Sequence, residues 1–380
     1  MVIILAPDSY KGSVSALGVA EAMERGVAQV FPQAEILKIP IADGGEGTVD
    51  ALVVATGGLK IAKEVQGPLG TPVQAFWGML GDGQTAVIEM AAASGLPLLS
   101  KEQRDPRITS TFGTGQLIKA ALDHGAKKII IGIGGSATND GGTGMAKALG
   151  AKFIDCDGKE LLEGGAALAR LAAIDLTDFD KRVAATQIMV ACDVDNPLCG
   201  CRGASAVYGP QKGATPAMVQ ELDAALGQFA TIAAQATGKD VAHHAGAGAA
   251  GGLGAGLLFF TGAQLRPGVE IVLETTGFTE LVAKAKFVIT GEGRTDFQTA
   301  FGKAPVGVAK AAKCYGVPVF CLSGGLGDGA DDVLDHGIDS VMSITPRPMD
   351  LEECIKHGEE LIEAASARLC QIIAAAMRMG

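Results

Sequence analysis

Four short segments, rich in glycine and in polar or charged side chains, each follow a short apolar run. They are residues 6–12 (APDSYKG), 43–48 (DGGEGT), 132–142 (GIGGSATNDGG) and 291–296 (GEGRTD). Short apolar runs bounded by glycine are typical of buried strands. In open α/β sheets, ligands collect at the carboxyl ends of the strands, where helix N-termini present free N–H groups to anions. The pattern therefore predicts parallel sheets that carry ligand-binding loops.

Both ends of the chain alternate strand and helix patterns. Near the start, residues 2–6 and 35–41 predict strands, with an amphipathic helix over 17–31 between them. Near the end, the predicted strands are 287–290, 317–322 and 340–344, and the last helix begins at Asp350. Such alternation is typical of a Rossmann-like parallel sheet covered by helices.

The middle of the chain has a different pattern. Residues 73–79 and 86–90 alternate as antiparallel strands do, with a Gly-Asp-Gly turn between them. Further on, the predicted elements are helix 114–123, strand 128–132, helix 143–149, strand 187–191 and a long helix from the Thr215 cap to about residue 236.

A chain of 380 residues is long for a single hydrophobic core. We therefore expect two domains with the active site in the cleft between them. The first is a Rossmann-like parallel α/β domain formed by residues 1–66 and 285–380. The second is an α/β domain, residues 67–284, inserted into the first.

Charge and composition argue against several classes of function. The net charge of −11, without a cluster of Lys and Arg, argues against nucleic-acid binding. Eight cysteines without a CxxC pair argue against zinc and against a disulfide framework. The N-terminus lacks the pattern of a signal peptide, and the uncharged run 245–265 is too rich in glycine for a membrane helix. We expect a cytoplasmic protein that binds small molecules.

The four glycine-rich segments fit phosphoryl transfer. Glycine lets backbone amides approach phosphate oxygens, Lys and Arg stabilise charge, and carboxylates hold Mg²⁺ or accept a hydroxyl proton. No GxxxxGK[ST] motif and no protein-kinase signature is present. Each segment alone is also compatible with ordinary turn chemistry, in which Asp8 caps a helix and Lys11 is a solvated charge.

The chain resembles the type-1 glycerate kinase family. The matching stretches run in order along nearly the whole sequence: APDSYKGS (6–13), PIADGGEGT (40–48), GIGGSATNDGG (132–142), DVDNPLCG (193–200), GASAVYGPQKGAT (203–215), GAGAAGGLGAG (246–256) and GEGRTDFQTAFGKAP (291–305). The resemblance implies an enzyme that uses ATP and Mg²⁺ to phosphorylate D-glycerate to 2-phosphoglycerate. It also implies two α/β domains, the second inserted in the first.

Candidate roles follow for residues in these motifs. Asp193 and Asp195 are the pair expected to activate the substrate hydroxyl, and Lys11, Arg294 and Lys212 are cations for the substrate carboxylate or the transferred phosphoryl group. Asp43 and Glu46, at a predicted helix start, are candidates for binding Mg²⁺ or for orienting phosphate-bound water. The remaining residues expected to contact substrate or nucleotide are Asp8, Ser9, Gly134, Gly135, Ser136, Thr138, Asn139, Asp140, Gly291, Gly293 and Asp296.

Several alternatives stay open. The acceptor could be a related sugar acid, or the product 3-phosphoglycerate. A non-catalytic nucleotide sensor would keep the fold without the transfer. The GxGxxG match at Gly246, Gly248 and Gly251 suggests a nicotinamide oxidoreductase, but no strand is predicted before it. The sequence leaves open whether the protein is a monomer or a homodimer.

Overall fold

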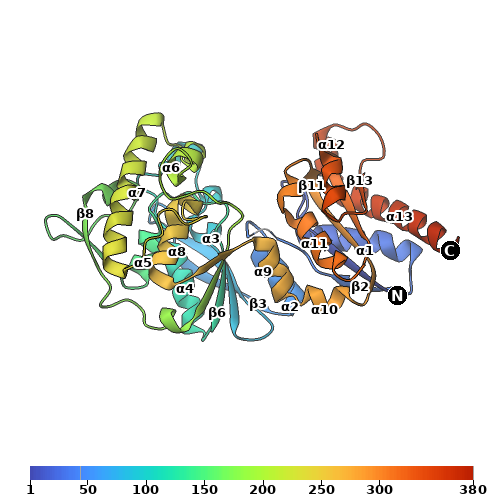
Figure 1. Ribbon diagram of the computed structural model, residues 1–380, viewed down its shortest axis with the longest axis horizontal. Coiled ribbons are helices and arrows are strands. Elements are labelled where there is room, and N and C mark those ends of the chain that lie inside the picture. Colours follow the sequence, from blue (N-terminus) through green and yellow to red (C-terminus); the bar gives the residue numbers. More distant parts are fainter. Residues whose placement is uncertain (43, 380) are drawn as a thin grey trace. The chain divides into compact units, whose positions relative to one another are not determined.

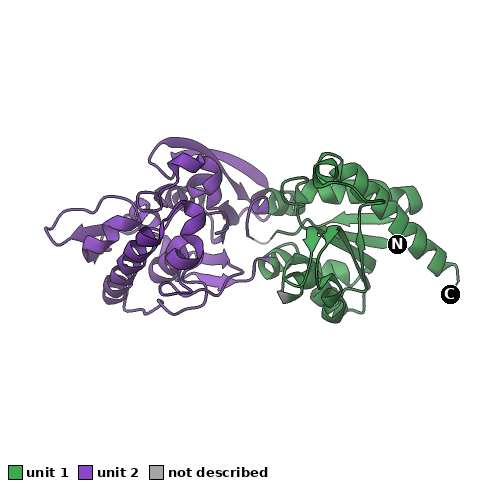
Figure 2. Cartoon of the chain, turned by 90° about the horizontal axis from the view of Figure 1, so that it is seen from above, with its two compact units in different colours: residues 1–43, 50–56, 269–380 green, residues 44–49, 57–268 purple. Residues whose placement is uncertain are grey.

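The computed structural model describes residues 1–42 and 44–379, which form two compact units (Figures 1 and 2). Unit 1 consists of residues 1–43, 50–56 and 269–380, and unit 2 of residues 44–49 and 57–268. In the described part of the chain, no helix is long and apolar enough to cross a membrane.

The sheet of unit 1 joins strands from both ends of the chain. Its order is β13-β12-β11-β1-β2, and every neighbouring pair is parallel. The strands are β1 (Val2–Pro7), β2 (Glu35–Lys38), β11 (Ala285–Thr295), β12 (Val319–Leu326) and β13 (Ser340–Ser343). The predicted parallel α/β architecture is confirmed.

Helices pack on both faces of this sheet because its strands are apolar on both sides. Helices α1 (Ala16–Val30) and α13 (Gly358–Met377) lie against each other and share a core with Ile3 and Leu5. Helix α11 (Ala304–Lys313) packs on β1, β11 and β12. The shorter helices are α2 (Thr48–Thr56), α9 (Gly268–Thr275), α10 (Phe278–Val282) and α12 (Leu351–Lys356).

Unit 2 has a six-stranded mixed sheet with the order β10-β9-β6-β5-β4-β3. Strands β5 (Thr85–Glu89), β6 (Lys128–Gly132), β9 (Gln187–Ala191) and β10 (Gln264–Arg266) are parallel, whereas β3 (Leu59–Gln66) and β4 (Pro72–Met79) continue the sheet in antiparallel fashion. A separate antiparallel pair is formed by β7 (Lys152–Asp155) and β8 (Leu171–Asp175).

The helices of unit 2 are α3 (Ala91–Ser94), α4 (Phe112–Asp123), α5 (Thr143–Ala148), α6 (Ala204–Tyr208), α7 (Pro216–Thr237) and α8 (Leu253–Thr261). The long helix α7 begins as predicted, because the Thr215 side chain accepts a hydrogen bond from the Met218 N–H and Pro216 occupies the first turn. It ends at Gly238, whose φ of 71° reverses the backbone.

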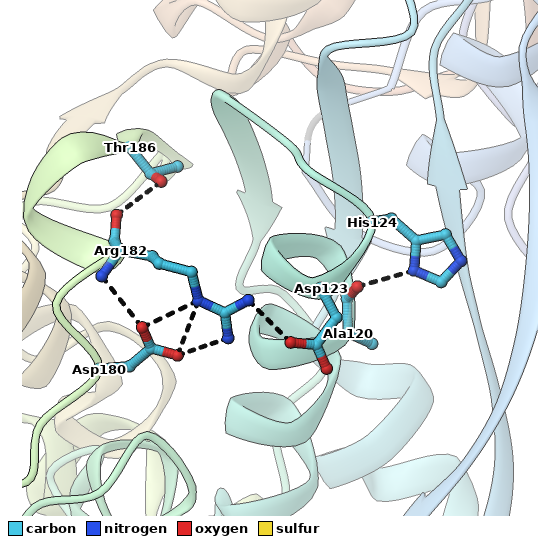
Figure 3. A network of polar contacts seen from close by, with 6 residues as sticks. All are labelled: Ala120, Asp123, His124, Asp180, Arg182 and Thr186. Atoms are coloured by element: carbon cyan, nitrogen blue, oxygen red, sulfur yellow. Dashed lines mark hydrogen bonds and ion pairs between the residues drawn. The ribbon is translucent and has the colours of Figure 1, made fainter.

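Arg182 joins two elements at the surface of unit 2 (Figure 3). Its guanidinium donates to both carboxylate oxygens of Asp180 at 2.7–3.2 Å and pairs with Asp123 at the end of α4 at 2.8 Å. In the next residue, Nδ1 of His124 lies 2.9 Å from the Ala120 carbonyl oxygen. Because the arginine side chain is 46% exposed, solvent screening limits each ion pair to about 1 kcal/mol or less.

The structure differs from the sequence-based expectation in three places. Residues 57–66 lie in unit 2, not with the first domain, because β3 pairs along its whole length with β4; residues 269–284 in turn lie in unit 1. The segment 291–295 is the end of a strand and not a loop, since it pairs with Leu322–Leu326 of β12. The predicted final helix is interrupted at His357, which separates α12 from α13.

Candidate active site

Strand β1 ends at Pro7, opposite Gly291 of β11, and β11 continues beyond this point to Thr295. From β1 the chain continues through α1 to β2 on one side of the sheet, and from β11 it continues through α11 to β12 on the other side. The strand order changes direction between these two strands. In doubly wound sheets ligands bind outside the strand ends at such a switch point, so the topology of unit 1 marks a candidate ligand site.

The loop after β1 occupies this position. The Asp8 N–H donates to the Gly291 carbonyl at 2.8 Å, and the Asp8 carboxylate accepts from the Ser9 N–H at 2.6 Å. A Cβ on Gly293 would lie 3.3 Å from Cα of Tyr10 and 3.4 Å from the Lys11 nitrogen. The structure thus brings together five predicted residues, Asp8, Ser9, Lys11, Gly291 and Gly293.

Arg294 and Asp296 complete the predicted set in unit 1. The Arg294 side chain is 70% exposed, and its Nε lies 3.5 Å from the Asp296 carboxylate. Lys303, at the start of α11, approaches the other oxygen of Asp296 at 3.9 Å. The sequence analysis did not select Lys303 or Glu292, although both lie in the same motif. Arg294 offers an exposed cation to an anionic ligand.

A glycine-rich segment of the chain, residues 44–49, lies against the carboxyl edge of the unit 2 sheet. Glu89, Gly132 and Ala191 are register partners at the ends of β5, β6 and β9. Gly44 lies directly on this edge: a Cβ on Gly132 would be 2.3 Å from the Gly44 carbonyl oxygen, which only glycine permits. The second glycine-rich segment therefore lies beside the third at the edge of the unit 2 sheet, although it was predicted in the first domain.

Glu89 is a residue that the sequence analysis missed. It is half-buried at the end of β5, and its Oε1 accepts from the Val49 N–H in the first turn of α2 at 2.7 Å. Glu46 is exposed just before α2. Asp43 lies outside the described residues. The available signal for Glu89 was its place as a charged residue near the carboxyl end of the predicted strand 86–90.

The 132–142 loop has an exposed part and a buried part. Gly134 and Gly135 are exposed, whereas Ser136, Thr138, Asn139 and Asp140 are buried. Of the residues predicted to meet a ligand here, only the two glycines therefore present their backbone at the surface in this structure. The four buried residues hold the loop in shape.

Asp140 organises the buried part. Its Oδ2 accepts from the Thr111 N–H and hydroxyl, both at 2.8 Å, and from the Gly144 N–H at 3.2 Å; its Oδ1 accepts from the Gly142 N–H at 3.1 Å. These donors belong to the starts of α4 and α5. Burial raises the pKa of this carboxyl, and the four hydrogen bonds act in the opposite direction. Asp140 thus fixes the loop to two helices.

Lys212 is buried with 1% of its surface exposed, at the end of the short helix Pro210–Lys212. Its Nζ donates to the Thr138 carbonyl at 2.7 Å. Burial lowers the pKa of Lys212 to about 7, although the Asp140 carboxylate acts to raise it. In this structure the buried Lys212 ammonium holds the 132–142 loop through the Thr138 carbonyl and is not exposed to a ligand. This differs from the expected role of Lys212 as a cation for the substrate or the phosphoryl group.

Lys212 makes stability depend on pH. Between about pH 7 and 10.5 the unfolded chain holds a proton on this lysine that the folded protein has lost, so stability rises with pH across this window. The expected slope approaches 1.4 kcal/mol per pH unit, about one proton. Urea unfolding of the wild type and of Lys212→Met at several pH values measures it. We expect a shallower rise in the variant, and parallel profiles would contradict the assignment.

The two aspartates after β9 differ in their surroundings. Oδ1 of Asp193 accepts from the Gly268 N–H at 3.0 Å. Asp195 forms an exposed ion pair with Arg202 at 2.8 Å. Between them and α6, Asn196 accepts from the Tyr208 hydroxyl at 2.6 Å. The Asp195 carboxylate therefore pairs with a guanidinium, and the Asp193 carboxylate accepts from a backbone amide.

A model of the glycerate kinase family matches residues 3–374. The chain belongs to this family. Glycerate kinase of Halalkalibacterium halodurans is 54% identical over 97% of each chain, and glycerate 2-kinase of Escherichia coli is 50% identical over 100% of this chain and 99% of its own. The chain is also similar to a solved structure of a protein described as glycerate kinase 2 from Salmonella typhimurium LT2. The two are 50% identical, and their structures align over 100% of each chain with a TM-score of 0.90. The resemblance inferred from the motifs is confirmed, and the chain is a kinase.

Kinases of small molecules use a divalent cation, and the carboxylates of this glycerate kinase family member are compatible with one. No group of three or more Asp, Glu, His or Cys side chains in the described ranges is arranged to hold a metal ion. Mg²⁺, however, keeps several waters and is usually bound by one or two carboxylates together with substrate phosphates. Glu46, exposed just before α2, and Glu89, at the carboxyl end of β5, are candidates for such carboxylates.

The Gly134–Gly135 amides of this kinase are expected to contact an anionic oxygen of the substrate or nucleotide. Gly135 has a φ of 73° and is exposed. Gly135→Val places a branched side chain on this surface, and we expect kcat/KM to fall by roughly 10²-fold, as when one such donor is lost. Steady-state kinetics with both substrates measures the effect.

Gly158→Val is the matched control for this substitution. Gly158 has a φ of 77° in the turn after β7, and nothing lies within 4 Å of its Cβ position. Both variants carry the same backbone cost, about 1–2 kcal/mol. If Gly135→Val is folded and as active as Gly158→Val, the loop does not contact the reacting molecules.

Proposed function

We propose that this protein transfers the γ-phosphoryl group of ATP to D-glycerate and forms 2-phosphoglycerate, with Mg²⁺ as cofactor. The observation that carries the proposal is the family match over residues 3–374, together with about 50% identity over full length to proteins named glycerate kinase and glycerate 2-kinase. The name of the Escherichia coli relative supports position 2 as the site of transfer.

Residues of unit 1 bind the acceptor in this proposal. Arg294 is an exposed guanidinium, and guanidinium groups bind carboxylates with two parallel hydrogen bonds. Lys11 is exposed on the loop that follows β1 and adds a second cation. Asp8 and Ser9 line the same switch point. A small hydroxy acid with one carboxylate suits this set of groups.

Residues of unit 2 act on the phosphates and on the reacting hydroxyl. The Gly134 and Gly135 amides bind phosphate oxygens. Glu46, Glu89 and Asp43 are the candidate carboxylates for Mg²⁺, which neutralises phosphate charge when bound. Asp193 accepts the proton of the acceptor hydroxyl, because it follows a strand of unit 2 and the Gly268 N–H orients its carboxylate.

An assay of ADP formation with a panel of acceptors tests this proposal. The panel contains D-glycerate, L-glycerate and larger sugar acids, each with and without Mg²⁺. We expect turnover with D-glycerate that stops when the cation is chelated. Faster turnover with another sugar acid would favour the related alternative, and ATP binding without turnover on any acceptor would favour a nucleotide sensor.

A further inference from the structure

Glu292 is a buried carboxylate at the switch point of unit 1 that has no role in the proposed reaction so far. Only 7% of its surface is exposed. It lies on β11, which is flanked by β1 and β12, directly after the residue paired with Pro7. A glutamate in this position must be hydrogen-bonded, because burial of an unpaired carboxylate is very costly.

Hydroxyl groups hold one of its two oxygens. Oε1 accepts from the Thr299 hydroxyl at 2.7 Å and from the Thr295 hydroxyl at 3.1 Å. The Thr295 oxygen in turn lies 2.6 Å from the Ser323 hydroxyl of β12. Three hydroxyls thus form a connected network that fixes the direction of the Glu292 side chain.

The second oxygen, Oε2, has no such partner. Within residues 1–42 and 44–379 no hydrogen bond engages it, and it is not one of the buried atoms that are sealed from solvent without a partner. Burial raises the pKa of Glu292, while the two threonines and Lys303 act to lower it. Oε1 is therefore held in place by hydroxyl groups, and Oε2 can accept a hydrogen bond from a donor outside the chain.

Charged side chains lie near this acceptor, since Lys303 acts to lower and Asp296 to raise the pKa of Glu292. Arg294 follows two residues later and is 70% exposed, and Lys303 is 43% exposed. Both face Asp296, whose side chain is only 16% exposed. A fixed hydrogen-bond acceptor beside exposed cations is complementary to a molecule that carries a hydroxyl next to a carboxylate.

We propose that Glu292 determines acceptor specificity by accepting a hydrogen bond, through Oε2, from the hydroxyl of the acid that is not phosphorylated, while Arg294 binds the carboxylate. This inference rests on the proposed function, since it names how that site selects its acceptor. In D-glycerate phosphorylated at position 2, the hydroxyl bound by Glu292 is the one on carbon 3.

D-Lactate is the probe for this contact, because it differs from D-glycerate only by the loss of the carbon-3 hydroxyl. A site built to bind a substrate hydroxyl rejects the analogue that lacks it, by up to 10⁴–10⁵-fold, because a buried polar group is then left unpaired. We expect wild-type kcat/KM to be at least about 10²-fold higher for D-glycerate than for D-lactate.

Two substitutions test the role of Glu292. Glu292→Gln keeps the size of the side chain and an oxygen for the threonines, and Glu292→Met removes both acceptors. We expect each variant to lower kcat/KM for D-glycerate more than for D-lactate, so that the ratio of the two falls at least 10-fold, more strongly in the methionine variant. The control is Glu35→Gln, because Glu35 is exposed at the amino end of β2 in the same sheet. This variant should keep the wild-type ratio.

Two results would overturn the inference: a wild-type enzyme that does not prefer D-glycerate to D-lactate, or folded variants that both keep the wild-type ratio, which includes equal losses on both acids. The wild-type comparison decides even if the variants do not fold. Calorimetric titration with the two acids, without ATP, separates this inference from the reaction. If Glu292-dependent preference for D-glycerate appears in binding while no phosphorylation occurs, the proposed reaction is wrong and the acceptor site stands.

Discussion

Asparagine in place of Asp193 is expected to lower kcat by roughly 10²–10⁴-fold while ATP affinity stays nearly unchanged. Asparagine keeps the oxygen that accepts from the Gly268 N–H, at 3.0 Å in the wild type, so the loop should keep its shape. What it loses is the ability to take up the proton of the acceptor hydroxyl. Turnover assays combined with nucleotide titration separate these two effects.

Asp195→Asn is the matched control, because Asp195 lies two residues away in the same loop. Its carboxylate is paired with Arg202 in an exposed ion pair, which contributes little. We expect this variant to keep most of its turnover. If it loses turnover and Asp193→Asn does not, the roles of the two aspartates are reversed. Near-normal turnover in both would move the role to Asp8 or Asp296.

Loss of the Asp140 side chain is expected to have the largest effect on stability. In Asp140→Ala the N–H groups of Thr111, Gly142 and Gly144 lose their acceptor inside the protein. The Asp140 carboxylate also acts to raise the pKa of Lys212, so its loss lowers that pKa further. Each buried donor that is left unpaired costs about 1–3 kcal/mol.

Urea unfolding at pH 7 measures this change. Arg182→Ala is the control within the same unit, because its half-exposed ion pairs predict a loss of about 1 kcal/mol or less. A folded Asp140→Ala protein with the same unfolding midpoint as Arg182→Ala would show that Asp140 does not hold the loop together.

Local chemistry allowed much of the fold to be predicted. The Thr215–Pro216 pair marked the start of α7, and short apolar runs marked β1, β6 and β9, because strand and helix signals there lie within a few residues. Strand β3 was missed because its sequence, LKIAKEVQ, is largely polar and mostly exposed. Its pairing with β4 decides its structure, and pairing is not a local property.

The same reason explains the error at 291–295. Two glycines in five residues indicate a turn, but β12 carries its own glycines opposite, and the two segments pair as strands. Only the register across 30 residues of intervening chain reveals this. The sequence therefore identified the motif, but a loop was predicted where the structure has a strand.

Burial was the other property that sequence could not supply. Lys212 carries the residue type of a phosphate-binding cation, yet its environment is the interior of unit 2. Thr138, Asn139 and Asp140 are polar residues in a glycine-rich loop, and they too are buried. Conversely, Glu292 was overlooked between two glycines, and Glu89 was overlooked near the end of an apolar strand. Residue type indicates which chemistry is available, and packing decides which side chains face a ligand.

The central claim is tested most directly by identifying the product of the reaction. The protein is incubated with ATP, Mg²⁺ and D-glycerate, and the mixture is examined by phosphorus and carbon NMR. We expect 2-phosphoglycerate, recognised by coupling of phosphorus to the proton on carbon 2. No product is expected when Mg²⁺ is chelated. A product phosphorylated at carbon 3 would contradict the assigned position, and the absence of any phosphoglycerate with ample folded enzyme would contradict the function itself.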